Sequence, residues 1–207
     1  EGLDNASLSI DARLGLVALL LQAGRDDEAD GHLADASRQA RLLGNPVVVA
    51  NVALSQFEAD LRRDQRVSAR AQLEQARRAL ADGDHDALRR EIRLREVILW
   101  IADGHHESAR ETLDELAADA DVRQDLEMHR RTRQLRAMLA MSAGRFAEGY
   151  VLWRGGEPGP VPREAHDPDV PNSALPPKAT AWLIAVLSAF LIGAALVAGD
   201  RLVAHAA

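Results

Sequence analysis

The stretch AGRDDEADGHLADA at residues 23–36 decides the fold, because the chain returns to the same pattern every 40 residues. The later versions are RDQRVSARAQLEQA at 63–76, DGHHESARETLDEL at 103–116 and AGRFAEGYVLW at 143–153. A repeat of this length is typical of solenoid proteins, in which each unit buries its apolar face against the next. The sequence therefore predicts a serial array of similar units.

Four positions of the pattern have a physical role. A break residue ends one helix and lets the chain reverse, and a small residue five places later allows the second helix to cross the first closely. A large apolar residue nine places later fills the space between units, and a small or apolar residue follows at twelve. The break residues are Gly24, Asp64, Gly104 and Gly144, and the small residues five places later are Ala29, Ala69, Ala109 and Gly149. The large apolar residues nine places after the break are Leu33, Leu73, Leu113 and Trp153. The residues twelve places after the break are Ala36, Ala76 and Leu116.

This pattern resembles the tetratricopeptide repeat (TPR) family, which places Gly, Ala, a large apolar residue and Ala at these spacings. The resemblance covers about residues 10–154, and it implies an all-α TPR-like array of about four helical hairpins that binds other proteins. It departs from the family in its 40-residue period, against about 34 in the family, and in Asp64, which replaces the expected Gly. An irregular helical bundle is the alternative.

Apolar residues recur at three- and four-residue steps through residues 1–154, as expected of amphipathic helices. Extra helix within residues 37–47 and 77–89 would account for the longer period. The fourth unit is truncated, since its second helix starts near Arg145 and must end before Gly155. Such a helix would cap the array or pack on a membrane surface. Helix breaks are expected at Gly24, Gly44 to Pro46, Asp82 to Asp84, Asp103 to Gly104, and Gly144.

The remainder of the chain changes character twice. Residues 155–178 contain all eight prolines except Pro46, which predicts a linker. Residues 179–199 (ATAWLIAVLSAFLIGAALVAG) hold no charged residue and would span about 32 Å as a helix, close to the thickness of a bilayer core. We therefore predict a transmembrane helix at 179–199, followed by a short tail at 200–207, with the lipid bilayer as one partner. A buried core helix is the alternative.

Two features bear on how that helix sits in a membrane. Small residues recur every fourth position at Ala181, Ala185, Ala189 and Gly193, a stripe that would let another helix approach, although plain alanine richness explains it equally well. More positive charge precedes the span than follows it, which favours a cytoplasmic array. A cleaved signal peptide would reverse that orientation, and the first residue, Glu1, leaves such processing open.

Composition and motifs exclude several functions. The chain has no cysteine, and its net charge of −7 with 3% aromatic residues argues against nucleic acid as a partner. The acidic run at Asp82 to Asp86 lacks the Gly and the final Glu of a calcium loop and is better read as a turn. His105 and His106 lack the further ligands that a metal needs. We expect no cofactor, no metal and no enzymatic activity.

Arginine clusters are the remaining candidates for a binding surface. Guanidinium groups form paired hydrogen bonds with carboxylates, so a row of arginines in a groove would hold an acidic partner. The alternative is that these arginines pair with glutamates on solvated helix faces. The candidates for partner binding are Arg62, Arg66, Arg93, Arg130 and Arg133.

These features together favour a membrane-anchored protein–protein interaction scaffold or adaptor, or an accessory subunit of a membrane complex. The alternative is a TPR-like sensor portion of a transmembrane signalling protein. The bias of 24 arginines to one lysine suggests a GC-rich bacterial genome, so we expect a single-pass protein of the bacterial inner membrane. The partner, the pathway and the side of the membrane on which the array lies stay open.

Overall fold

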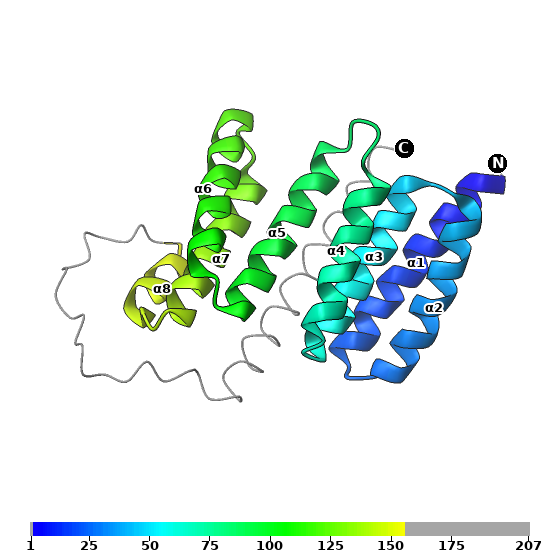
Figure 1. Cartoon of the computed structure of the whole chain (residues 1–207), viewed down its shortest axis with the longest axis horizontal. Coiled ribbons are helices and arrows are strands. Elements are labelled where there is room, and N and C mark those ends of the chain that lie inside the picture. Colours follow the sequence, from blue (N-terminus) through cyan, green and yellow to red (C-terminus); the bar gives the residue numbers. More distant parts are fainter. Residues whose placement is uncertain (1, 156–207) are drawn as a thin grey trace. The chain divides into compact units, whose positions relative to one another are not determined.

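The computed structural model describes residues 2–155, which form eight α-helices and no strand within that range (Figure 1). The predicted all-α class is confirmed for this part of the chain, and the packed helices are compatible with a helical-repeat fold. The helices are α1 (Gly2–Gln22), α2 (Asp26–Leu43), α3 (Pro46–Arg62), α4 (Arg66–Ala79), α5 (Asp86–Asp103), α6 (His106–Arg123), α7 (Leu126–Ser142) and α8 (Phe146–Trp153).

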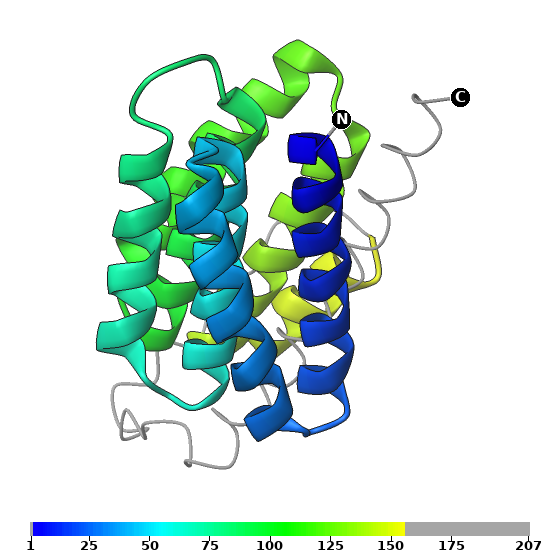
Figure 2. The ribbon, with the colours of Figure 1, turned by 90° about the vertical axis from the view of Figure 1, so that its right-hand side faces the viewer.

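The described helices divide into two compact units near Ile92, and each is considered by itself. In the first unit, α1 to α4 lie side by side with α1 against both α2 and α3 (Figures 1 and 2). In the second unit, α7 packs against both α6 and α8. The neighbours of each helix are therefore mainly helices adjacent in the sequence, as expected when hairpins follow one another.

One turn geometry recurs at all four predicted break residues. Their backbone φ angles are 71° at Gly24, 56° at Asp64, 78° at Gly104 and 79° at Gly144, all in the left-handed region. In each turn the amide of the break residue donates to the carbonyl three residues earlier, and the next amide donates to the carbonyl five residues before itself. This pair of bonds is the Schellman arrangement that ends a helix. The four breaks are thus the same structural device, 40 residues apart.

A second set of turns separates one hairpin from the next. Gly44, at φ 66°, ends α2, and the Asn45 side chain then caps α3 by accepting hydrogen bonds from the amides of Val47 and Val48. Gln124, at φ 53°, ends α6, and the Asp125 carboxylate accepts from the amide of Met128. The break at Gln124 was not predicted, because glutamine is not a residue that typically marks a left-handed turn.

The burial predicted for the repeated small and large apolar residues is mostly confirmed. Ala29, Ala69 and Ala109 are fully buried, and Leu33, Leu73 and Leu113, nine places after each break, are buried as well. Trp153 is the exception and corrects the prediction: it is 41% exposed, because it lies at the end of the truncated fourth hairpin and no described helix follows it.

Extra helix was predicted to account for the 40-residue period. The structure shows it at the end of α2 but not between α4 and α5. Residues 37–43 extend α2, so extra helix lengthens the first unit. In contrast, α4 ends at Ala79 and residues 80–85 form a non-helical connection, so a longer turn lengthens the second 40-residue repeat.

The interior of the first unit explains why a small residue follows twelve places after the break. Ala36 and Ala40 of α2 share a buried cluster with Val48 and Val52 of α3 and with Ile10 of α1. Because the α2 side chains at this crossing are methyl groups, the β-branched valines of α3 can approach the helix closely. Each buried aliphatic side chain adds about 1.5–3 kcal/mol of hydrophobic stabilisation.

No helix within residues 2–155 is long and apolar enough to cross a bilayer. The predicted transmembrane stretch at 179–199 lies outside the described residues. So do the stripe of Ala181, Ala185, Ala189 and Gly193, the tail at 200–207 and nearly all of the linker.

Candidate interaction surfaces

Two of the predicted binding arginines lie in the first unit, on either side of the Asp64 turn. Arg62 is the last residue of α3 and Arg66 is the first residue of α4. Arg66 Nε donates to Asp64 Oδ1 at 2.7 Å, so its charge lies against the turn. Arg62 is partly buried. The two arginines therefore flank one turn, with Arg66 held against Asp64.

The other three candidates lie in the second unit. Arg93 of α5 forms an ion pair with Glu115 of α6. Arg130 of α7 makes a two-pronged contact with Glu127, with Nη2 and Nε at 2.7 and 3.0 Å from the two carboxylate oxygens. Arg133 lies one turn further along α7, is exposed, and has no ion-pair partner among residues 2–155.

The Arg93–Glu115 pair belongs to a repeated contact that the sequence did not reveal. Arg13 Nη1 of α1 donates to Asp35 Oδ2 of α2 at 3.0 Å. These two residues precede Arg93 and Glu115 by two full 40-residue periods. The same cross-helix ion pair therefore joins the two helices of the first hairpin and the two helices of the third.

Two further ion pairs connect one hairpin to the next within each unit. Arg63, at the end of α3, reaches back to Asp30 of α2 with Nη2 2.7 Å from Oδ1. In the second unit, Arg136 Nη2 of α7 lies 2.6 Å from Asp114 Oδ1 of α6. Because the partners come from different hairpins, these pairs add an orienting contact to the apolar packing between consecutive hairpins.

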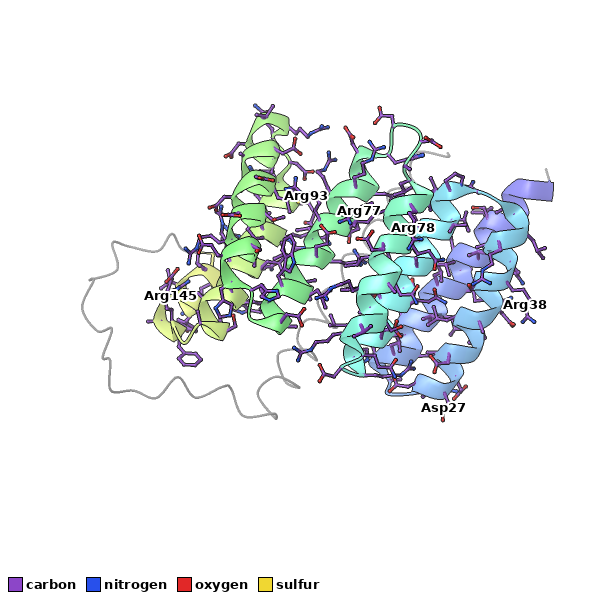
Figure 3. The ribbon with its side chains drawn as sticks, viewed as in Figure 1. Asp27, Arg38, Arg77, Arg78, Arg93 and Arg145 are labelled. Atoms are coloured by element: carbon purple, nitrogen blue, oxygen red, sulfur yellow. The ribbon has the colours of Figure 1, made fainter. Side chains whose placement is uncertain are left out.

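Many of the remaining charges form local pairs on solvated helix faces. Figure 3 shows Arg38 extending away from α2, where it meets Asp35. Arg25 makes a two-pronged contact with Glu28 at 2.6 and 2.7 Å, and the hydrogen bond from Arg25 lowers the pKa of the Glu28 carboxyl. The hydrogen bond to Glu127 likewise raises the pKa of Arg130. Exposed pairs of this kind contribute little to stability, because water screens the charges.

His106 and the acidic turn have contacts within the fold, whereas the His105 side chain makes no capping hydrogen bond. His105 occupies the cap position of α6, and His106 Nε2 lies 3.4 Å from Ser142 Oγ of α7. In the Asp82 to Asp86 turn, Arg89 Nη2 donates to the carbonyls of Leu80 and Gly83. Within residues 2–155 no three His, Asp or Glu side chains converge as a metal site would require.

Exposed apolar side chains gather on α1 and α8, and single ones lie elsewhere at Leu42, Val67, Val122 and Leu126. Leu8, Leu16 and Leu19 are exposed on α1, the first helix of the first unit. On the eight-residue helix α8 the exposed apolar residues are mainly aromatic, and Arg145 lies at its start (Figure 3). The aromatic surface of α8 was not predicted, because the pattern alone placed Trp153 in the space between units.

The sequence was also compared with known proteins. No family model matches the chain, and neither any curated protein nor any solved structure matches it.

Proposed function

We propose that this protein is a membrane-anchored scaffold that binds another protein through its helical-repeat array. The observation that carries the proposal is the recurrence of one turn geometry at Gly24, Asp64, Gly104 and Gly144, 40 residues apart. Solenoid proteins built from repeated hairpins commonly hold a segment of a partner on the surface of their stacked helices. The TPR-like spacing supports protein binding, and the uncharged stretch 179–199 supports a single-pass anchor.

The partner segment that suits the arginine surfaces is acidic. Arg93 and Arg130 each hold a glutamate through an ion pair at the surface, with part of each guanidinium exposed. Because exposed pairs contribute little to stability, a partner carboxylate can replace the glutamate at small cost. A guanidinium also makes two parallel hydrogen bonds to a carboxylate, which gives the exchange directional specificity.

A charge exchange at one ion pair tests the protein-binding role. Arg93→Glu places two acidic side chains together and is expected to reduce capture of the partner by the full-length protein in native membranes. The double variant Arg93→Glu/Glu115→Arg restores an ion pair between α5 and α6 but moves the positive charge to α6. If the partner contacts Arg93, the double variant recovers thermal stability and not partner capture.

The comparison separates binding from folding. Recovery of both stability and capture in the double variant would show that Arg93 matters only for the hairpin, and would remove it from the binding surface. Unchanged capture in Arg93→Glu itself would have the same consequence. Arg110→Glu is the matched control, because Arg110 is also paired, with Glu107 at 3.0 Å, but was not assigned to the surface.

The anchor is tested separately by flotation and protease access. Full-length protein reconstituted into sealed vesicles is expected to float with lipid after carbonate washing. Protease added outside the vesicles would then remove the array from one orientation only and leave a protected fragment containing residues 179–199. Protein that is released by carbonate would contradict the transmembrane anchor.

A further inference from the structure

The last described helix, α8, has a buried side that fixes it to the second unit. Gly149 faces α7 so closely that a Cβ there would lie 2.5 Å from Met141 Cγ and 2.8 Å from the Ala137 carbonyl oxygen. Leu152, three residues later, is also buried. The orientation of α8 about its own axis is therefore set by this packing, and its opposite side must face outward.

The exposed flank of α8 next to this packed side is aromatic. Phe146, Tyr150 and Trp153 are 61%, 57% and 41% exposed. Their spacing of four and three residues places the three rings on one face of the helix. In contrast, Phe57 in the first unit is completely buried. This concentration of exposed aromatic area on eight residues requires an explanation.

The 40-residue repeat shows that Phe146 and Tyr150 are a local change, whereas Trp153 occupies a column that is apolar in every hairpin. In the first three hairpins the positions equivalent to Phe146 and Tyr150 carry polar or charged side chains. These equivalents are Asp26, Arg66 and His106 for Phe146, and Asp30, Arg70 and Arg110 for Tyr150. A fourth unit that only lacked a following helix would keep polar residues at these positions. Among the second helices of the four hairpins, only α8 has aromatic residues there.

Two arginines lie beside the aromatic rings. The Arg154 guanidinium carbon lies 5.8 Å from the centre of the Tyr150 ring. Arg133 of α7 reaches the same end of α8, since a Cβ on Gly155 would lie 3.8 Å from Arg133 Nη2. Aromatic rings with adjacent guanidinium groups suit the boundary of a bilayer, where rings enter the acyl region and guanidinium groups bind lipid phosphates.

The chain itself limits how far α8 can be from such a boundary. The uncharged stretch begins at Ala179, 26 residues after Trp153. Even a fully extended chain of that length reaches only about 90 Å. If residues 179–199 span a bilayer, α8 is held close to its surface at a high effective concentration.

We propose that the Phe146–Tyr150–Trp153 face of α8 binds the bilayer surface, with Arg133 and Arg154 on phospholipid phosphates. This inference rests on the membrane anchor of the proposed function. It adds a second contact between the protein and the membrane, which would hold the second unit at the surface. The occupant is lipid and not a second copy of the chain, because guanidinium groups beside interfacial aromatic rings match a phosphate layer.

The absence of cysteine makes the test direct, because one introduced cysteine can carry a unique label. Phe146→Cys places an environment-sensitive fluorophore within the aromatic face of α8, and Val122→Cys places the same fluorophore on the exposed end of α6 as a matched control. Full-length protein is reconstituted into phosphatidylcholine vesicles with and without phosphatidylglycerol. We expect the label at residue 146, and not that at residue 122, to shift to shorter wavelength and to be quenched by spin-labelled lipid.

Removal of the rings should abolish the signal without unfolding the protein. In Tyr150→Ser/Trp153→Ser labelled at residue 146, the buried contacts of Gly149 and Leu152 remain, so helicity should be preserved while lipid quenching at residue 146 is lost. Arg133→Gln/Arg154→Gln should remove the added quenching caused by phosphatidylglycerol. Persistence of lipid quenching in the double-serine variant would overturn the aromatic contact.

The remaining outcomes separate this inference from the proposed function. If the protein floats with vesicles and the label at residue 146 is quenched only by a water-soluble quencher, α8 does not bind the bilayer and the anchor still stands. Energy transfer between labels at residue 146 on different copies, without lipid quenching, would assign the face to self-association and overturn the inference. Failure to float would overturn the anchor and the α8 contact with it.

Discussion

Arg13 of α1 donates to Asp35 of α2 across the first hairpin at 3.0 Å, and two repeats later Arg93 and Glu115 form the equivalent contact. The second hairpin has Ala53 and Gln75 at the same positions, so it closes without this ion pair. The contact is therefore compatible with the repeat geometry but not required by it. Apolar packing holds each hairpin together, and the ion pair adds orientation.

The first prediction compares two arginines that share Asp35. The Arg13 side chain is 24% exposed and the Arg38 side chain is 72% exposed, so water screens the Arg13 contact less. We expect Arg13→Gln to lower the free energy of unfolding by about 1 kcal/mol or less, and Arg38→Gln to have a smaller effect. Urea denaturation of both variants and of each combined with Asp35→Asn measures the two coupling energies. Equal couplings would contradict the prediction.

The second prediction concerns the left-handed turns. Gly104 has φ 78°, a region where a Cβ costs about 1–2 kcal/mol, so Gly104→Ala should destabilise the protein by about that amount. Asp64 occupies the equivalent turn at φ 56°. Asp64→Gly should stabilise the protein by relieving this backbone strain, although it also removes the ion pair with Arg66, which offsets part of the gain. Thermal unfolding should show a lower melting temperature for Gly104→Ala and a higher one for Asp64→Gly. A loss of stability in Asp64→Gly would mean that the Arg66 contact outweighs the backbone strain.

The third prediction applies one substitution to two helical glycines. A Cβ on Gly31 of α2 would have no neighbouring atom within 4 Å, so Gly31→Ala should stabilise the helix by about 0.5–1 kcal/mol. Gly149→Ala would place Cβ 2.8 Å from a backbone carbonyl oxygen of α7 and should loosen α8. Hydrogen exchange of the α8 amides, which should accelerate only in Gly149→Ala, distinguishes the two.

The fourth prediction is a pH dependence at the start of α2. The hydrogen bond from Arg25 lowers the pKa of Glu28. A carboxyl whose pKa is lower in the folded protein adds stability above its unfolded pKa of about 4.3, and that contribution is lost as the pH falls through the folded pKa.

Arg25→Gln should therefore raise the pKa of Glu28 and reduce stability near neutral pH. Its stability should converge with that of the unmodified protein at low pH. Carboxyl NMR titration and acid-dependent denaturation measure the two effects. A stability difference that grows as the pH falls would have the wrong sign and would reject the pair as its source.

The repeat columns could be predicted because each depends on a local physical rule. Left-handed turns favour glycine, and a close helix crossing favours alanine, so Gly24 and Ala29 indicated the hairpin before any contact was known. Gln124 gave no such signal, although it adopts the same left-handed conformation. Gln124 lies where α6 ends and the chain turns into α7, and the residue type at this position does not indicate that turn.

The ion pairs could not be predicted for a different reason. Arg93 has glutamates nearby on its own helix, at 91 and 96, yet it pairs with Glu115 of α6. The choice depends on how two helices cross and on which side chains meet at that crossing. The spacing of residues in the sequence predicts which side chains share a face of one helix. It does not predict how that helix is rotated about its axis relative to the next helix.

The sequence by itself determined the helices, the four equivalent turns and the small residues that let each hairpin close, because these follow from backbone conformation and side-chain volume within one repeat. Tertiary packing decided which faces stay uncovered. Trp153 has the volume to fill a space between hairpins, but it is exposed because no described helix follows α8. Gly149 fixes the rotation of α8, and that rotation places the aromatic face outward.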